Sequence, residues 1–271
     1  MSISSLKAIS PIDGRYHSKI EELSEFFSEK ALIKYRLLVE IEYFISLTEI
    51  KLPNLKKWDV KMNESIRDIY RNFNDNDANE VKMIEKSTNH DVKAVEYFIK
   101  NKFKLLKLEK FSEYIHFGLT SQDINNTAIP MSIKDFMPFY NSKINELISE
   151  LNLKVKEYSR ISMLARTHGQ PASPTRLGKE IDVFRTRIKE QFKVLTSIPI
   201  SCKFGGATGN LNAHKIAFPD INWIKFAENF AEKLNLEISY PTTQIEHYDN
   251  LARLFDNLKR INTIILDLNR D

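Results

Sequence analysis

The residues best suited to chemistry lie where a helical pattern is interrupted, between residues 165 and 180. His168 is followed by Gly169 and soon afterwards by Pro171. Because Gly and Pro both interrupt helices, we predict that His168 lies in a short loop between two long helices. An imidazole with an ordinary pKa near 6.5 can transfer protons at neutral pH, so His168 is a candidate acid or base. The alternative is a histidine that only hydrogen-bonds a loop carbonyl.

Two further polar clusters contain groups that can hold an anion. Asn89, His90 and Asp91 precede a stretch of buried helical character, and Thr120 and Ser121 follow a glycine that interrupts another. Both places are expected to be helix starts, where free backbone N–H groups and the positive end of the helix dipole attract anions. Simple helix capping is the alternative for both clusters, but it leaves His90 unexplained.

A third candidate lies near the N-terminus, where residues 10–16 are predicted to form a turn. This turn presents Arg15 and Tyr16. A guanidinium offers two parallel donors to a phosphate or a carboxylate, so Arg15 could bind either group. A solvated surface arginine is the alternative.

The glycine-rich stretch from Gly205 to Gly209 has no Gly-Lys-Ser or Gly-Lys-Thr ending. A nucleotide P-loop is therefore not expected, and close approach of the backbone to a partner or ligand is the preferred interpretation.

The elements that must position these residues are helices, because apolar residues recur at spacings of three and four through most of the chain. We predict an all-α fold with a small N-terminal helical domain, residues 1–110, followed by part of a long-helix bundle, residues 111–271. A charged stretch near residues 104–110 marks the expected boundary. The predicted helices span about 18–50, 60–73, 77 onward, 133–158, 174–195, 221–234 and 251 onward.

Composition narrows the function classes. The 271 residues include 40 basic and 36 acidic side chains without a basic block, which favours small anionic ligands over nucleic acid. The sequence shows neither an apolar run of membrane-spanning length nor a signal peptide, so we expect a cytoplasmic protein without a membrane partner. A single cysteine, Cys202, favours neither a disulfide nor a thiolate metal site.

Five segments follow one another in a family's order along the whole chain. They are Ser-Pro-Ile-Asp-Gly-Arg-Tyr, Thr-Asn-His-Asp-Val-Lys-Ala-Val-Glu-Tyr-Phe, His-Phe-Gly-Leu-Thr-Ser-Gln-Asp-Ile-Asn-Asn, Arg-Thr-His-Gly-Gln-Pro-Ala and Pro-Thr-Thr-Gln-Ile-Glu. With these segments the sequence resembles the bacterial type of the adenylosuccinate lyase family, within the fumarase/aspartase superfamily. Five ordered motifs are much more specific than any one of them.

This resemblance implies an all-helical homotetramer whose active sites are assembled from more than one subunit. It also implies a β-elimination, without metal or cofactor, that releases fumarate from adenylosuccinate, giving AMP, and from the succinyl-carboxamide ribotide of purine synthesis. Implied roles are general acid for His168, nucleotide contact for Arg15 and Tyr16, pocket lining for Asn89, His90 and Asp91, and substrate binding for Thr120, Ser121 and Gln244.

The sequence departs from the family in one respect. The family's loop with the pattern Ser-Ser-x-Met-Pro, which supplies the serine base, is not found in residues 1–271, and neither is its C-terminal helical domain. We therefore expect a truncated chain that is inactive alone. The alternatives are another succinyl-substrate lyase of the superfamily, and a non-catalytic helical oligomer.

Overall fold

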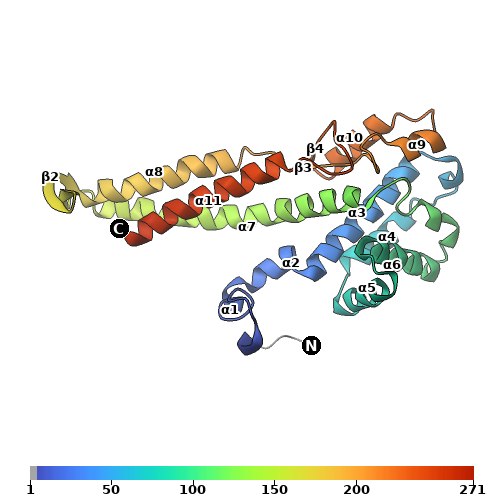
Figure 1. Cartoon of the computed structure of the whole chain (residues 1–271), viewed down its shortest axis with the longest axis horizontal. Coiled ribbons are helices and arrows are strands. Elements are labelled where there is room, and N and C mark those ends of the chain that lie inside the picture. Colours follow the sequence, from blue (N-terminus) through green and yellow to red (C-terminus); the bar gives the residue numbers. More distant parts are fainter. Residues whose placement is uncertain (1–4) are drawn as a thin grey trace. The chain divides into compact units, whose positions relative to one another are not determined.

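The computed structural model describes residues 5–271, which form helices and two small two-stranded sheets (Figure 1). The prediction of a helical fold is confirmed. None of the described helices is long and apolar enough to cross a membrane. The helical elements are η1 Ser5–Lys7, α1 His17–Ile20, η2 Glu21–Leu23, α2 Ser24–Phe27, α3 Glu29–Glu49, η3 Pro53–Leu55, α4 Met62–Arg71, α5 Asp75–Thr88, α6 Asp91–Leu105, η4 Glu109–Tyr114, α7 Ser121–Glu157, α8 Leu177–Leu195, α9 Asn212–Ala217, α10 Trp223–Lys233 and α11 Asp249–Arg270. The strands are β1 Ser162–Thr167, β2 Gln170–Arg176, β3 Ser201–Cys202 and β4 Glu237–Ile238.

Packing divides the chain into two compact units. Unit 1 comprises Met1–Phe136 and Ser201–His247, and unit 2 comprises Met137–Ile200 and Tyr248–Asp271. Helix α7 therefore begins in unit 1 and ends in unit 2. This division differs from the boundary expected near residue 110, because later segments complete the core of the N-terminal helices. The domain boundary itself stays a prediction.

Helix α3 lies at the centre of unit 1. It begins after Ser28, whose side chain accepts a hydrogen bond from the backbone N–H of Ala31 at 3.1 Å. Most of its side chains are buried on every face, which is typical of a core helix. Tyr43 shows why the core is discontinuous in sequence, since its ring contacts those of Phe204 and Phe230 at 5.1 and 5.9 Å between centroids.

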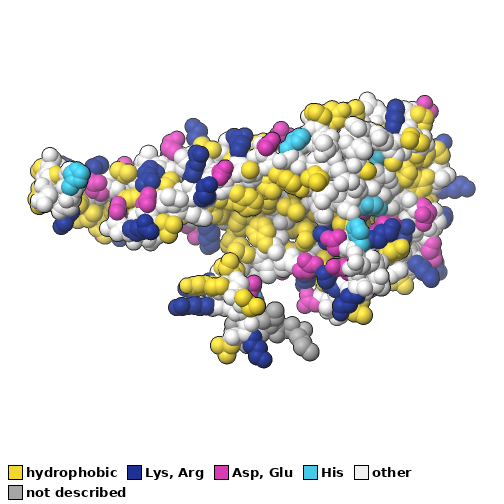
Figure 2. Space-filling model, viewed as in Figure 1, with side chains coloured by type: hydrophobic (Ala, Val, Ile, Leu, Met, Phe, Trp, Pro, Cys, Tyr) yellow, Lys and Arg dark blue, Asp and Glu magenta, His cyan; other side chains and the backbone are white. Residues whose placement is uncertain are grey.

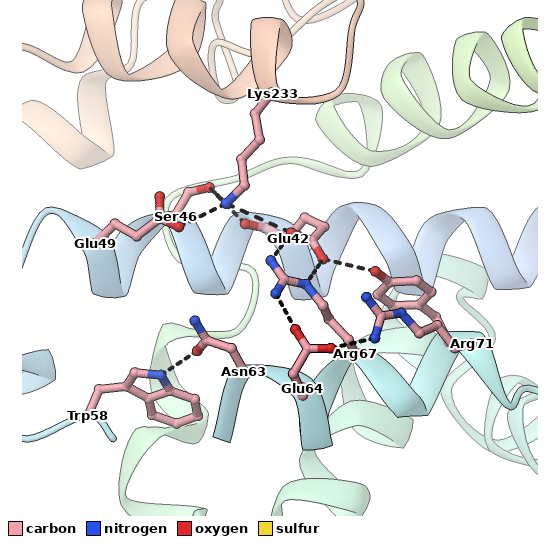
Figure 3. Close-up of polar contacts among 10 residues, drawn as sticks. Glu42, Ser46, Glu49, Trp58, Asn63, Glu64, Arg67, Arg71 and Lys233 are labelled. Atoms are coloured by element: carbon pink, nitrogen blue, oxygen red, sulfur yellow. Dashed lines mark hydrogen bonds and ion pairs between the residues drawn. The ribbon is translucent and has the colours of Figure 1, made fainter. Parts of the chain in front are cut away.

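Buried carboxylates of α3 are matched by cations from other helices. Glu42 accepts hydrogen bonds from Arg67 Nε and Nη2 at 2.7 and 3.0 Å and from the Tyr70 hydroxyl at 2.9 Å (Figure 3). Burial would raise the pKa of the Glu42 carboxyl, but the hydrogen bonds from Arg67 and Tyr70 outweigh it and hold that pKa below its ordinary value. This cluster joins α3 to α4, and Lys233 adds a contact from α10 at 3.8 Å.

Helix α7 begins at Ser121, where a helix start was expected, and it continues through Pro130 and Pro138 into the long helix that was expected separately from about residue 133. A proline inside a helix leaves the carbonyl four residues earlier without its helical donor. For Pro130 that carbonyl belongs to Asn126, and it accepts a hydrogen bond from the backbone N–H of Lys203 at 3.3 Å. The proline is therefore accommodated because another segment of unit 1 uses the carbonyl it leaves open.

Unit 2 contains the second half of α7 together with β1, β2, α8 and α11. Helices α8 and α11 pack along each other through apolar side chains such as Ile188 and Ile261, both fully buried. Polar contacts between the same two helices include Asn257 with Gln191 at 3.1 Å and an ion pair of Arg187 with Asp267.

The segment between α7 and α8 corrects one prediction. Residues 162–176 form an antiparallel hairpin of β1 and β2, and α8 begins at Leu177 instead of Pro174. Ser173 and Pro174 had indicated a helix start, but Pro174 pairs with Leu164 in the hairpin. Proline is tolerated there because a two-stranded hairpin has a free edge on each strand, where no backbone donor is needed.

Candidate active site

Asp123 joins the start of α7 to the glycine-rich loop. Its Oδ1 accepts hydrogen bonds from Lys203 Nζ at 2.7 Å and from the backbone N–H groups of Gly205 and Gly206 at 2.8 and 3.1 Å. Its Oδ2 accepts from the backbone N–H of Thr120 at 2.8 Å, as the third residue of a helix does in a capping box. Asp123 and Lys203 are both fully buried, so this ion pair fixes the position of Thr120.

The same loop supports the segment that carries Gln244. Gly209 has φ of 78°, and its Cα lies so close to the carbonyls of Thr242 and Thr243 that a side chain would collide with them. The expected close approach of the backbone is thus made to the protein itself. Gln244 is exposed, and the glycine loop couples its segment to the start of α7.

Asn89, His90 and Asp91 form the junction between α5 and α6. Asn89 ends α5 with φ of 50°, a left-handed conformation that Asn tolerates better than most residues. His90 caps α6, since its Nδ1 accepts a hydrogen bond from the backbone N–H of Lys93 at 3.2 Å. Its Nε2 therefore carries the proton in the neutral ring and lies 3.4 Å from the Ser121 hydroxyl. Two of the predicted clusters, from α6 and α7, thus meet.

Arg36 of α3 links the first of these clusters to helix α7. Its Nη2 contacts the Asp91 carboxylate at 2.6 Å, and its Nε donates to the Asn125 amide oxygen at 2.9 Å. Burial would raise the pKa of the Asp91 carboxyl, but the charge of Arg36 and the backbone N–H of Val92 hold it below its ordinary value. The Arg36 guanidinium is almost wholly buried, so we infer that it positions the site from within the core.

An open surface pocket lies over this junction. Its cavity volume is about 540 Å³, and its lining residues are Lys82, Glu85, Lys86, Asn89, His90 and Asp91. Lys82 already pairs with Glu29 and Glu85, so Lys86, His90 and the start of α6 are the donors that this pocket offers to an anionic ligand.

Arg15 and Tyr16 lie in a turn before α1, as predicted, and both side chains are exposed. The Arg15 guanidinium lies 5.7 Å from the centre of the Tyr16 ring. Within residues 5–271 neither side chain is hydrogen-bonded to another candidate. Among the unit 1 candidates, the structure brings the Asn89–Asp91 cluster into contact with Ser121, whereas Gln244, Arg15 and Tyr16 make no described contact with that group.

His168 lies at the tip of the β1–β2 hairpin. With Gly169 it forms a two-residue turn in which both φ angles are positive, 51° and 74°, as in a type I′ turn. The imidazole is exposed. His168 belongs to unit 2, whereas the other candidates belong to unit 1. It lies in an interruption between long helices, as expected, although a hairpin replaces the short loop.

Two histidines that sequence reasoning did not select lie around the turn that precedes α7. The Tyr43 hydroxyl donates to the carbonyl of Phe117 and contacts His214 Nε2 at 2.9 Å. Gly118, with φ of 69°, packs so closely on the His214 ring that a Cβ would lie 2.7 Å from it. His116 pairs with Glu40 of α3. The sequence signal that could have pointed to them is the presence of Arg36, Glu40 and Glu42 in the otherwise apolar helix α3, because buried charged side chains need partners.

Burial of His214 predicts acid sensitivity. Burial lowers the pKa of this imidazole to about 4, below its ordinary value of 6.5. Between these pH values the unfolded chain binds a proton that the folded chain does not, so stability is complete above pH 6.5 and is lost as the pH falls. The free energy of unfolding should fall by roughly 3 kcal/mol through this one group.

Urea denaturation at pH 7 and pH 4.5 checks this expectation by comparing the chain with its His214→Gln variant. The variant should be less stable at pH 7 but should lose less stability on acidification. An equal loss in both proteins would contradict the assignment, because all other titrating groups are shared.

Known protein structures share this fold. The helical arrangement is similar to that of a fumarate lyase from Mesorhizobium sp. BNC1, with a TM-score of 0.76 at 19% identity over 92% of this chain and 55% of that one. A β-carboxy-cis,cis-muconate cycloisomerase from Acinetobacter calcoaceticus is similar, with a TM-score of 0.73 at 18% identity over 93% of this chain and 56% of that one. At these identities the likeness concerns the fold alone.

The family follows from the sequence comparison. The family described as "Lyase" matches residues 14–271, and the chain belongs to this lyase family. Curated relatives named adenylosuccinate lyase are 53% identical in Dictyostelium discoideum, 43% in Legionella pneumophila (strain Corby) and 39% in Escherichia coli (strain K12). Each alignment covers the whole of this chain and 60% of the relative, so the chain spans about three-fifths of their length.

Proposed function

We propose that this chain is part of an adenylosuccinate lyase, which eliminates fumarate from adenylosuccinate to give AMP and acts likewise on the succinyl-carboxamide ribotide of purine synthesis. The observation that carries the proposal is the 53% identity over the whole chain to a relative of that name. The donor-rich junction of α5, α6 and α7 supports it, because this substrate has a phosphate and two carboxylates to be bound.

The proposed reaction needs a base and an acid on either side of the bond that breaks. A base removes a proton from carbon, charge develops on the neighbouring carboxylate, and an acid protonates the departing nitrogen. We assign the acid to His168, whose exposed ring at a hairpin tip can approach a bound ligand. The base is assigned to the family's serine loop, outside residues 1–271.

Substrate contacts are assigned by motif. Arg15 and Tyr16 would contact the nucleotide, because a guanidinium suits a phosphate and an aromatic ring suits a base. Thr120, Ser121 and Gln244 would bind the substrate. The pocket over the α5–α6 junction, with Asn89, His90 and Asp91, would complete the cavity.

We also propose that the protein is cytoplasmic and that it associates with copies of itself. The helices of unit 2 expose large apolar side chains among their charged ones, and Figure 2 shows such a mixed surface on one face. Burying them against copies of this chain in a homotetramer would remove apolar area from water. The exposed apolar residues on these helices include Leu153, Val183, Val194, Phe255 and Leu266.

The test follows fumarate release from adenylosuccinate by two proteins. One contains this chain together with the serine loop and should release fumarate; the other is residues 1–271 alone and should not, because acid and base must both be positioned. Equal rates would place the base within residues 1–271. Activity only on another succinyl compound would favour a different lyase of the superfamily. If neither protein shows any lyase activity, a non-catalytic helical oligomer is favoured.

A further inference from the structure

A buried carboxylate–imidazole pair joins helix α3 to the turn that precedes α7. Glu40 of α3 is fully buried, and its Oε1 lies 2.5 Å from Nδ1 of His116. Its other oxygen, Oε2, is buried and has no hydrogen-bond partner. Within residues 5–271 His116 is the only group ion-paired with Glu40. Because a buried carboxylate without a counter-charge is unfavourable, the position of Glu40 favours the positively charged form of the His116 ring.

The backbone around His116 fixes the direction of its ring. His116 has φ of 59°, an uncommon conformation for a residue other than glycine, and the next two residues are clamped by contacts of their own. The Tyr43 hydroxyl of α3 donates a hydrogen bond to the carbonyl of Phe117, and the His214 ring packs against Gly118. Since Nδ1 is used by Glu40, the ring can present only Nε2 to a ligand. That atom makes no hydrogen bond in the described part of the chain, and the side chain is 18% exposed.

Charges from three helices act on this imidazole. Burial works against the charged ring, but Glu40 on α3, Glu96 on α6 and Asp123 on α7 favour it, and together they raise the pKa of His116 above its ordinary value. Asp123 is neutralised by Lys203, and Glu96 pairs with Lys93 and Lys100. Among the described residues Glu40 has no ion-pair partner other than His116. A protonated ring would offer an N–H donor with a positive charge just before the start of α7.

We propose that Glu40 is a positioning residue that holds His116 as a charged donor, with Nε2–H available to an anionic oxygen of the substrate. The inference rests on the proposed function for the identity of that substrate. A carboxylate oxygen of the succinyl part and a phosphate oxygen of the nucleotide share the required chemistry. Glu40 itself stays in the core and acts only through the ring.

The first experiment measures the titration of the histidine ring directly. In this chain, carrying 13C-labelled histidine, the signal of His116 among the six histidines is assigned by its loss in His116→Gln. His116 should titrate above pH 6.5 in the unaltered chain and at a lower pH in Glu40→Gln. A ring that titrates below 6.5 in the unaltered chain, or identically in the variant, would overturn the proposal.

Matched controls lie on the same helix. Glu42→Gln removes another buried carboxylate, and Glu49→Gln removes an exposed one that pairs with Lys233 at 3.0 Å (Figure 3). Neither should move the His116 titration. If Glu42→Gln does not fold, Glu49→Gln still separates a specific effect of Glu40 from a general loss of negative charge. A shift in Glu49→Gln as large as in Glu40→Gln would contradict a specific role.

The second experiment identifies the ligand group by calorimetry, in the protein that contains this chain and the serine loop. Glu40→Gln should weaken the binding of either AMP or fumarate by about tenfold, and the affected ligand shows whether His116 contacts phosphate or carboxylate. Unchanged affinity for both would overturn the ligand contact. If neither ligand binds the unaltered protein, the proposed function fails, while the histidine titration still decides the role of Glu40.

Discussion

Replacing His168 by asparagine is expected to lower kcat by about 10²–10⁴-fold, the usual contribution of a general acid or base, while KM changes little. Asparagine is the informative substitution because His168 has φ of 51°, and Asn tolerates that conformation. The hairpin turn is then kept and only the imidazole is lost. Fumarate release from adenylosuccinate by the protein that contains the serine loop is the measurement.

The hairpin also offers a control for this substitution. Met163→Ala changes an exposed side chain on β1 and leaves the imidazole in place, so its kcat should stay close to that of the unaltered protein. Near-normal turnover in the His168 variant would remove His168 from the proposed mechanism. A matching loss in both variants would show that the hairpin acts through its structure instead.

Replacing Lys203 by methionine is expected to lower the free energy of unfolding by about 3–5 kcal/mol, because it leaves the fully buried Asp123 without its cation. The backbone donors of Gly205 and Gly206 remain, but they do not neutralise the charge. This loss is a large part of the stability of an ordinary domain, so the variant should unfold at much lower urea concentration.

A double-mutant cycle isolates the pair. Combining Lys203→Met with Asp123→Asn should cost less than the sum of the two single changes, since the second removes the charge that the first leaves unpaired. Lys225→Met is the control, because Lys225 pairs with Glu228 on the surface and should contribute about 1 kcal/mol or less. Strictly additive losses would show that the two buried charges do not depend on each other.

Local periodicity was sufficient to predict most helices, because each signal depends on residues a few positions apart. The segment around Ser173 and Pro174 was misread since a capping residue followed by proline is equally compatible with a strand that has a free edge. The turn at His168 and Gly169 lacked the Asn-Gly or Asp-Gly pair that marks most two-residue hairpins. The capping pattern at Ser173-Pro174 and the lack of a hairpin signal at His168-Gly169 therefore both favoured a loop and a helix start over the β1–β2 hairpin.

The partners of the buried charges could not be predicted in the same way. Arg36 and Glu40 stand out as charged residues within an apolar helix, but Arg36 contacts Asp91 and Asn125, and Glu40 contacts His116. These pairings join residues 55 to 89 positions apart, and no local pattern encodes them. The motif residues were visible in the sequence, whereas the core residues that orient them became visible only in the fold.

The discontinuity of unit 1 has a consequence for the order of events during synthesis. Asp123 is followed by Lys203 only 80 residues later, which takes roughly 4–16 s at ribosomal rates of about 5–20 residues per second. Throughout that interval the Asp123 carboxylate lacks its cation, and the Tyr43 ring of α3 lacks its contacts with Phe204 and Phe230. The N-terminal helices therefore stay partly uncovered until the segment that follows α7 and α8 has been synthesised. Apolar surface exposed in this way during synthesis is what chaperones bind.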